Sequence, residues 1–364
     1  MDASIIDKTL LSNIGVFRLD NIGDGVLTSA LLRNLRQELP QSRITVFAWE
    51  GVAKYFQTCP YVNSTVALPR IAPSQRQEPE VQAFIDKFGQ HFSGAFDLAV
   101  NPRSAPDHYY AGLLVARTEA EYRLGFRQTD FISDFNPNPC YNYLINTPPQ
   151  RPVTEINLEV LRALGIEPGS ASPEVWIDNL TQQRADELLD REEPAGGFCA
   201  VTIGAADPFK IWPCEQFSEI VSFLAARLSM VSVLIGSGED RECGEFIKHH
   251  NQESCIDLTG RTTLSELAGV VKRCHLYVGN DTGPKHFAAA LGVPVVEITG
   301  LPEVSVDFPY DTGVYFQAYD VRNVIIRPTS FFSRQEVVSG QAIESITVEV
   351  VEEKIQELLG LQLD

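Results

Sequence analysis

The feature that most constrains the fold is an alternation of strand and helix signals that occurs twice along the 364 residues. Short apolar runs typical of buried strands are followed by stretches with the apolar spacing of a helix. This alternation predicts parallel sheets with helices on both faces. The predicted strands are residues 14–19, 44–49, 62–68, 96–100, 198–203, 231–235, 276–278 and 293–298. We therefore expect an α/β protein.

A proline-rich stretch separates the two runs. Residues 128–153 can form neither a regular helix nor a central strand, since their prolines are Pro137, Pro139, Pro148, Pro149 and Pro152. A chain of this length allows two domains at roughly 150 residues each. We predict a first domain over residues 1–150 and a second over 151–340. A C-terminal helix within 341–364 could pack back onto the first domain.

Composition excludes several classes of protein. The formal net charge is -19, from 48 acidic and 29 basic residues, and so acidic a surface disfavours the phosphate contacts that dominate nucleic-acid binding. No apolar run is long enough for a membrane span, and the N-terminus has no signal-peptide pattern, so we expect a cytoplasmic protein. The seven cysteines are scattered without a CxxC pair, which predicts buried free thiols and no metal site.

Loops that follow predicted strands are where ligands bind in open α/β sheets. The first such loop is "RLDNIGDG", residues 18–25, which lacks the GxGxxG fingerprint of dinucleotide binding. Its Asp24 stands at the mouth of the next helix. The carboxylate could cap that helix, which is the commoner role for Asp, or act as a catalytic base.

Two further loops carry candidate anion-binding groups. In "GAADPFKIWP", residues 204–213, Lys210 could meet a phosphate or be an ordinary solvated lysine, while Trp212 could pack against the next helix. In "GNDTGPKH", residues 279–286, a strand leads directly into a helix whose backbone N–H groups favour an anion. Thr282 and His286 could add hydrogen bonds or charge, or this loop could simply cap its helix.

Four segments together resemble a known family. They are "RLDNIGDGVLTSALLRNLR" (18–36), "FDLAVNPRSAPDHYYAGLLVARTEAEYRLGF" (96–126), "KIWP" (210–213) and "GNDTGPKHFAAALGVP" (279–294). They are similar to the bacterial ADP-heptose:lipopolysaccharide heptosyltransferases, glycosyltransferase family 9. The resemblance implies a GT-B architecture, with two facing Rossmann-like domains, parallel sheets and an interdomain cleft. The first domain would bind the acceptor and the second the nucleotide-sugar.

The same resemblance implies an inverting, metal-independent transfer without a cofactor. A heptose or related sugar would move from ADP-heptose, or another nucleoside diphosphate sugar, to a glycan or glycolipid acceptor such as lipopolysaccharide core. Inversion needs one base and no protein nucleophile, and Asp24 matches the catalytic base of the family.

The resemblance also assigns binding residues. The donor phosphates would be bound by Lys210, Asp281, Thr282, Gly283 and His286. Glu239 follows the turn at residues 236–238, so its position suggests a donor nucleoside contact. Candidates on the acceptor side are Asn21, Gly23, Arg103, His108, Arg123 and Arg127. Each of the four basic residues, Arg103, His108, Arg123 and Arg127, is on its own more often an ordinary surface residue, but their clustering favours an anionic acceptor.

Two other functions remain open. An epimerase of the same architecture would bind the nucleotide-sugar without an acceptor, and a non-catalytic sugar-nucleotide-binding module would have the fold without the chemistry. If the acceptor is membrane-linked, we expect transient contact with the cytoplasmic leaflet, at the inner face of the membrane, and no nucleic-acid partner.

Overall fold

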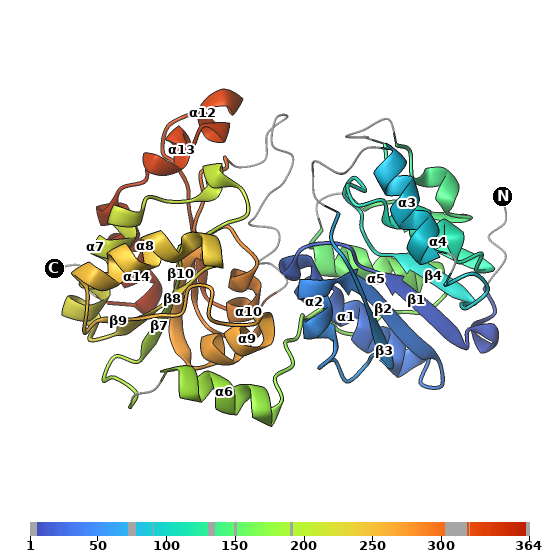
Figure 1. The fold of residues 1–364 in the computed structure, drawn as a ribbon, viewed down its shortest axis with the longest axis horizontal. Coiled ribbons are helices and arrows are strands. Elements are labelled where there is room, and N and C mark those ends of the chain that lie inside the picture. Colours follow the sequence, from blue (N-terminus) through green and yellow to red (C-terminus); the bar gives the residue numbers. More distant parts are fainter. Residues whose placement is uncertain are drawn as a thin grey trace. The chain divides into compact units, whose positions relative to one another are not determined.

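The computed structural model describes residues 6–71, 78–89, 91–129, 135–148, 151–189, 192–302, 319 and 321–361. The chain divides into two compact units, Met1–Trp176 and Ile177–Asp364. Figure 1 shows that each unit is a sheet covered by helices.

The sheet of the first unit has six parallel strands in the order β3-β2-β1-β4-β5-β6. The strands are β1 (Asn13–Phe17), β2 (Arg43–Trp49), β3 (Ser64–Leu68), β4 (Leu98–Asn101), β5 (Tyr122–Phe126) and β6 (Tyr143–Ile145). The helices are α1 (Ile22–Glu38), α2 (Glu50–Phe56), α3 (Glu78–Gly89), α4 (Ala111–Arg117) and α5 (Val153–Ala163). Phe17 and Phe47 stack with ring centroids 4.2 Å apart, so neighbouring strands β1 and β2 are joined through the core.

The sheet of the second unit is also parallel and six-stranded, in the order β12-β11-β10-β7-β8-β9. Its strands are β7 (Phe198–Thr202), β8 (Val231–Ile235), β9 (Cys255–Asp257), β10 (Cys274–Asn280), β11 (Val295–Ile298) and β12 (Asn323–Ile326). Its helices are α6 (Asn179–Leu189), α7 (Cys214–Leu228), α8 (Arg241–His250), α9 (Leu264–Lys272), α10 (Pro284–Ala290), α12 (Arg334–Val338), α13 (Gln341–Glu344) and α14 (Val348–Leu359).

Counted from its own first strand, each sheet has the order 3-2-1-4-5-6 of a Rossmann fold. The direction in which strands are added reverses between β1 and β4 in the first unit and between β7 and β10 in the second. A crevice at the carboxyl ends of such a strand pair is the usual ligand site, so the fold itself selects the loops after these four strands.

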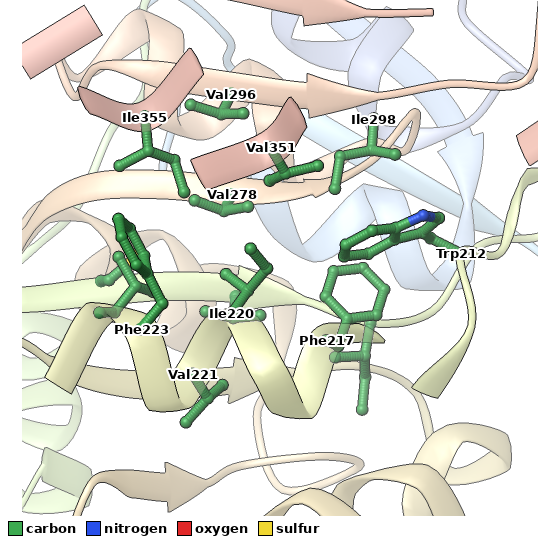
Figure 2. Packing of buried hydrophobic residues seen from close by; sticks show 14 of the residues in the cluster. Trp212, Phe217, Ile220, Val221, Phe223, Val278, Val296, Ile298, Val351 and Ile355 are labelled. Carbon is green, nitrogen blue, oxygen red and sulfur yellow. The ribbon is translucent and has the colours of Figure 1, made fainter. Parts of the chain in front are cut away.

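The core of the second unit explains the position of the C-terminal helix. Figure 2 shows Val351 and Ile355 of α14 beside the apolar side chains of β10 and β11, with α7 nearby. Both residues are completely buried, and α14 contacts α7 and β12. The helix therefore completes the core of the second unit, whereas the sequence suggested that it could pack onto the first domain.

The division between the units lies after the predicted boundary at residue 150. The segment that follows α5 is bound to α1: Arg33 donates to the carbonyl oxygens of Ser170 and Ser172, and Asn34 donates to that of Ser170. Trp176 stacks on Tyr55 of α2. These contacts keep residues up to 176 with the first unit, although the proline-rich stretch comes earlier.

The prediction that every cysteine is a free thiol is wrong for one pair. Cys214 at the start of α7 and Cys243 in α8 form a disulfide, with Cα atoms 5.7 Å apart. The two helices pack against each other, a proximity that a separation of 29 residues does not reveal. The remaining five cysteines are free and buried, as predicted.

Within the described ranges, no helix combines the length and the apolar character that a membrane crossing requires.

Candidate functional site

In the first unit, the loops after β1 and β4 are joined by a row of charged side chains. Arg18, only 2% exposed, pairs through Nε with Asp20 at 3.2 Å and through Nη2 with Asp24 at 2.9 Å. Arg103, which follows β4, pairs with the other oxygen of Asp20. Asp20 therefore links the two loops that flank the reversal point of the sheet.

Asp24 is the third residue of α1, and its side chain is 32% exposed. The N-cap position belongs to Asn21, and the Asp24 carboxylate accepts from Arg18. The capping role that the sequence left open is therefore not the one its side chain performs.

The pKa values of the two carboxylates in this row, Asp20 and Asp24, are shifted in opposite directions. Burial raises the pKa of Asp24, and this effect outweighs the opposing charge of Arg18. Burial also acts on Asp20, but Arg103 and Arg18 together hold the pKa of Asp20 below its ordinary value. Asp20 is thus a fixed negative charge, while Asp24 is the better proton acceptor of the pair.

The other predicted residues of the first unit are dispersed. Gly23 is buried in the first turn of α1, and Asn21 at its N-cap accepts a hydrogen bond from Arg70. His108 lies in the same β4–α4 loop as Arg103, and its charge acts on Asp20. The Arg103 guanidinium also donates to the carbonyl of Pro106, so much of its hydrogen-bonding capacity is taken up by groups of the protein itself.

Arg123 and Arg127 lie at opposite ends of β5. Arg127 follows the strand at its carboxyl end, where Nε donates to Asn146 at 3.1 Å. It lines a pocket of about 330 Å³ together with Ser104, Pro106, Gln128, Thr129, Asn146 and Thr147. Arg123 lies near the amino end and donates to the carbonyls of Ala120 and Cys140. The structure therefore brings Arg127, but not Arg123, to the carboxyl edge of the sheet.

Arg70 is a cation that the sequence reasoning missed. It follows β3 at the same edge, is exposed, and donates to Asn21 and to the Tyr109 hydroxyl. Since residues 62–68 were predicted as a strand, the rule that ligands meet the loops after strands could have found it.

In the second unit, the loops after β7 and β10 are also joined by charge. Lys210 Nζ donates to Asp281 at 2.9 Å, and Lys285 of α10 pairs with the other oxygen of Asp281. Lys285 Nζ in addition lies 2.9 Å from Glu297 of β11. The sequence predicted Lys210 and Asp281 but not their contact, and it missed Lys285 and Glu297.

In the rest of the β10–α10 turn, partly exposed residues follow the buried Asn280. Thr282 and Gly283 are partly exposed. The Asn280 side chain joins the two loops: its Oδ1 accepts from the backbone N–H of Trp212, and its Nδ2 donates to the backbone carbonyl of Ile203. Trp212 itself is fully buried and packs edge-on against Phe217 of α7, as the sequence suggested.

His286 is buried next to this turn, with Nδ1 2.9 Å from the Tyr319 hydroxyl. Burial, helped by the nearby Lys285 charge, lowers the pKa of His286 to about 3. The imidazole is consequently neutral near pH 7, and of the two roles considered for it only hydrogen bonding remains.

Glu239 lies at the carboxyl end of β8, one strand from the Lys210 loop. It is exposed, and its backbone N–H donates to the Ser237 side chain, which fixes the turn before α8. Among the described residues, no group of three or more His, Cys, Asp or Glu side chains is arranged to hold a metal ion.

A model of glycosyltransferase family 9 (heptosyltransferase) matches residues 86–303, more than half of the chain. Lipopolysaccharide heptosyltransferase 3 of Escherichia coli is 23% identical over 314 residues, which cover 84% of this chain and 88% of that protein.

Solved structures share the fold over nearly the whole chain. The glycosyl transferase family 9 protein of Veillonella parvula DSM 2008 has a TM-score of 0.72 and 21% identity, covering 96% of this chain and 97% of its own. The E. coli heptosyltransferase WaaC with ADP has a TM-score of 0.70 and 18% identity, covering 95% and 99%. The predicted α/β fold with two Rossmann-like parallel sheets, the GT-B architecture, is confirmed.

Proposed function

Because the chain belongs to glycosyltransferase family 9, we propose that it transfers a heptose from ADP-heptose to an acceptor in the core of lipopolysaccharide. The first unit binds the acceptor and the second binds the donor. The similarity to a lipopolysaccharide heptosyltransferase and to a heptosyltransferase structure with ADP supports these substrates.

One observation carries the proposal: each Rossmann unit has a charged group suited to one half of the reaction at the reversal point of its sheet. In the first unit, Asp24 is a partly exposed carboxylate with a raised pKa. In the second, Lys210 extends from the loop after β7 and is 24% exposed. A base and a cation for a leaving diphosphate are the groups that a single displacement needs.

The reaction is one in-line displacement. Asp24 takes the proton from the acceptor hydroxyl as its oxygen attacks the anomeric carbon of the heptose. The bond from that carbon to the diphosphate oxygen breaks, ADP leaves with the electron pair, and the anomeric configuration inverts. Asp20 stays ionised between Arg18 and Arg103, so it holds Arg18 against Asp24 without competing for the proton.

Departure of ADP requires stabilisation of negative charge. Lys210 supplies a cation, the Thr282 hydroxyl and the backbone of Gly283 supply hydrogen bonds, and neutral His286 supplies a further one. Glu239 is placed to accept from a ribose hydroxyl. These protein groups perform the stabilisation that a metal ion would otherwise provide, and the transfer is metal-independent.

On the acceptor side, anionic groups of the lipopolysaccharide core are recognised by cations at the carboxyl edge of the first sheet. Arg127 beside its pocket, Arg70 and His108 are the groups best placed for this. Because the acceptor is anchored in a membrane, the enzyme meets it at the cytoplasmic leaflet.

The test is release of ADP from ADP-heptose, measured with and without heptose-deficient lipopolysaccharide and repeated with a chelator. The proposal predicts release only with the acceptor and unchanged rates in chelator. Conversion of the donor without acceptor would indicate an epimerase, and binding without turnover would indicate a non-catalytic module; either result overturns the proposal.

A further inference from the structure

Behind the predicted donor site lies a row of four side chains with alternating charge, Lys210, Asp281, Lys285 and Glu297. Only Lys210 at its outer end is appreciably exposed, with 24% of its side chain accessible. Lys285 is 1% exposed and Glu297 is completely buried. The row therefore runs from the surface into the interior, across β10, α10 and β11.

We propose that Lys285 and Glu297 are positioning residues for the donor diphosphate, with Lys285 as the permanent counter-ion of Asp281 that allows Lys210 to move onto the donor. This inference rests on the proposed function, because it concerns the same donor site. It assigns roles to two buried residues that do not touch the donor.

Asp281 is shared between the two lysines of the row. Its two oxygens are engaged by two different ammonium groups, one from Lys210 and one from Lys285. When Lys210 turns to a diphosphate, a carboxylate with 12% of its side chain exposed would lose a partner. An uncompensated, nearly buried charge is strongly unfavourable. Lys285 keeps the Asp281 carboxylate paired after Lys210 has left, because the buried Lys285 stays in the interior.

The charge states of Lys285 and Asp281 agree with this role, while burial raises the pKa of Glu297 against the opposing charge of Lys285. Burial lowers the pKa of Lys285, but Asp281 and Glu297 outweigh it, so that the pKa lies above its ordinary value. Burial raises the pKa of Asp281, but Lys285 and Lys210 hold it well below its usual range. Lys285 and Asp281 thus form an ion pair at neutral pH.

Glu297 sets how strongly Lys285 acts on the outer residues. One of its oxygens pairs with Lys285, and the other has no hydrogen-bond partner among the described residues. A buried ion pair often contributes little to stability, because replacing both of its residues by apolar ones is often neutral or stabilising. Their presence in the core is explained if Lys285 is needed to hold positive charge next to Asp281 and Glu297 compensates that charge in the interior.

The experiment compares ADP binding to the full chain by calorimetry in five variants: Lys285→Met, Glu297→Gln, the double variant of both, Lys210→Ala, and Lys210→Ala combined with Lys285→Met. Loss of the Lys285 charge, alone or in the double variant, should weaken ADP binding by about tenfold, the effect of one unit charge at close range. Glu297→Gln keeps the cation and removes an anion, so it should bind ADP at least as tightly as the original chain.

The double variant guards against misfolding, because it leaves no unpaired charge at the inner end of the row. Donor KM should rise about tenfold in this variant while kcat at saturating donor changes less than threefold, a split that general loosening of the fold would not produce. In the Lys210→Ala background, removing Lys285 should have little further effect, because the two act on one carboxylate.

Two results separate the possible failures. A folded double variant that binds ADP within twofold of the original chain, while Lys210→Ala binds weakly, overturns the role of Lys285 and leaves the donor site intact. If Lys210→Ala itself binds ADP normally, the proposed donor site fails and this inference fails with it.

Discussion

Two neighbouring carboxylates in the first unit should respond to the same substitution in opposite ways. Asp24→Asn should abolish most activity and leave stability nearly unchanged, whereas Asp20→Asn should lower stability sharply. The difference follows from their surroundings. Asp24 is 32% exposed with one guanidinium contact, while Asp20 is 2% exposed between Arg18 and Arg103.

For Asp24→Asn, the expected effects are a large loss of kcat and a small change in the free energy of unfolding. Loss of a positioned base lowers kcat by about 10² to 10⁴, equivalent to about 3–5 kcal/mol of transition-state stabilisation. Since the pKa of Asp24 is raised in the folded state, ionising it costs folding free energy at neutral pH, and a neutral Asn removes no stabilisation. The free energy of unfolding should therefore change by less than about 1 kcal/mol.

Ionised Asp20, unlike ionised Asp24, stabilises the folded state. Its pKa is lowered on folding, so its contribution is fully present above its unfolded pKa and is lost as the pH falls through the folded value. Removing one member of a buried charge network costs about 3–5 kcal/mol, or roughly 6–20 °C in Tm for a unit of this size.

The assay pairs ADP release with thermal denaturation on the same preparations, with Lys54→Met as a matched surface-charge control. Asp24→Asn should retain its Tm and its affinity for ADP. An Asp24→Asn variant with kcat within tenfold of the original chain would refute the catalytic assignment, and an Asp20→Asn variant of unchanged Tm would refute the structural one.

Three further predictions follow from the same geometry. Lys210→Ala should raise donor KM and lower kcat together, each by about tenfold or more, because the cation binds the diphosphate before and during its departure; unchanged kinetics in a folded variant would reject that role. On the acidic side, kcat/KM should fall about tenfold per pH unit below the pKa of Asp24, which is raised above that of an ordinary aspartate. An acid limb centred at or below the ordinary aspartate pKa would contradict this. Reduction of the disulfide should lower the free energy of unfolding by about 2–4 kcal/mol, as measured by denaturant titration, while a Cys214→Ser/Cys243→Ser variant should show no response to reductant.

Much of the fold could be predicted because most strands are continuous apolar runs. The strands that were missed are β5, β6, β9 and β12, which are short, lie at or next to a sheet edge, or carry polar residues. In β5, Arg123 and Gly125 interrupt the apolar pattern, and β6 has three residues inside the proline-rich stretch. Local sequence patterns are weak for such strands, whose pairing depends on the neighbouring strand.

The loops of the site could be predicted from the strand-then-helix pattern, but the contacts between them could not. Lys210 meets Asp281 because β7 and β10 are neighbours, and strand order cannot be read from spacing. The contact between Asp20 and Arg103 could not be predicted either, because it depends on β1 and β4 being neighbours. Glu297 was overlooked because it stands inside an apolar strand, and its pairing with the buried Lys285 cannot be seen in the sequence.

The direction of a strand also decides which residues share a site. Arg123 and Arg127 are close in sequence and were predicted to act together, but β5 places them at opposite ends. Only Arg127 reaches the edge where the loops of the first unit meet. A cluster in the sequence is therefore weaker support for a site than a set of positions that follow successive strands.

The most direct test of the central claim is mass spectrometry of heptose-deficient lipopolysaccharide after incubation with the protein and ADP-heptose. With the original chain, the acceptor should gain the mass of one heptose. With Asp24→Asn it should gain almost none, even though that variant still binds ADP. An unmodified acceptor with the original chain, or equal modification by Asp24→Asn, would contradict that claim.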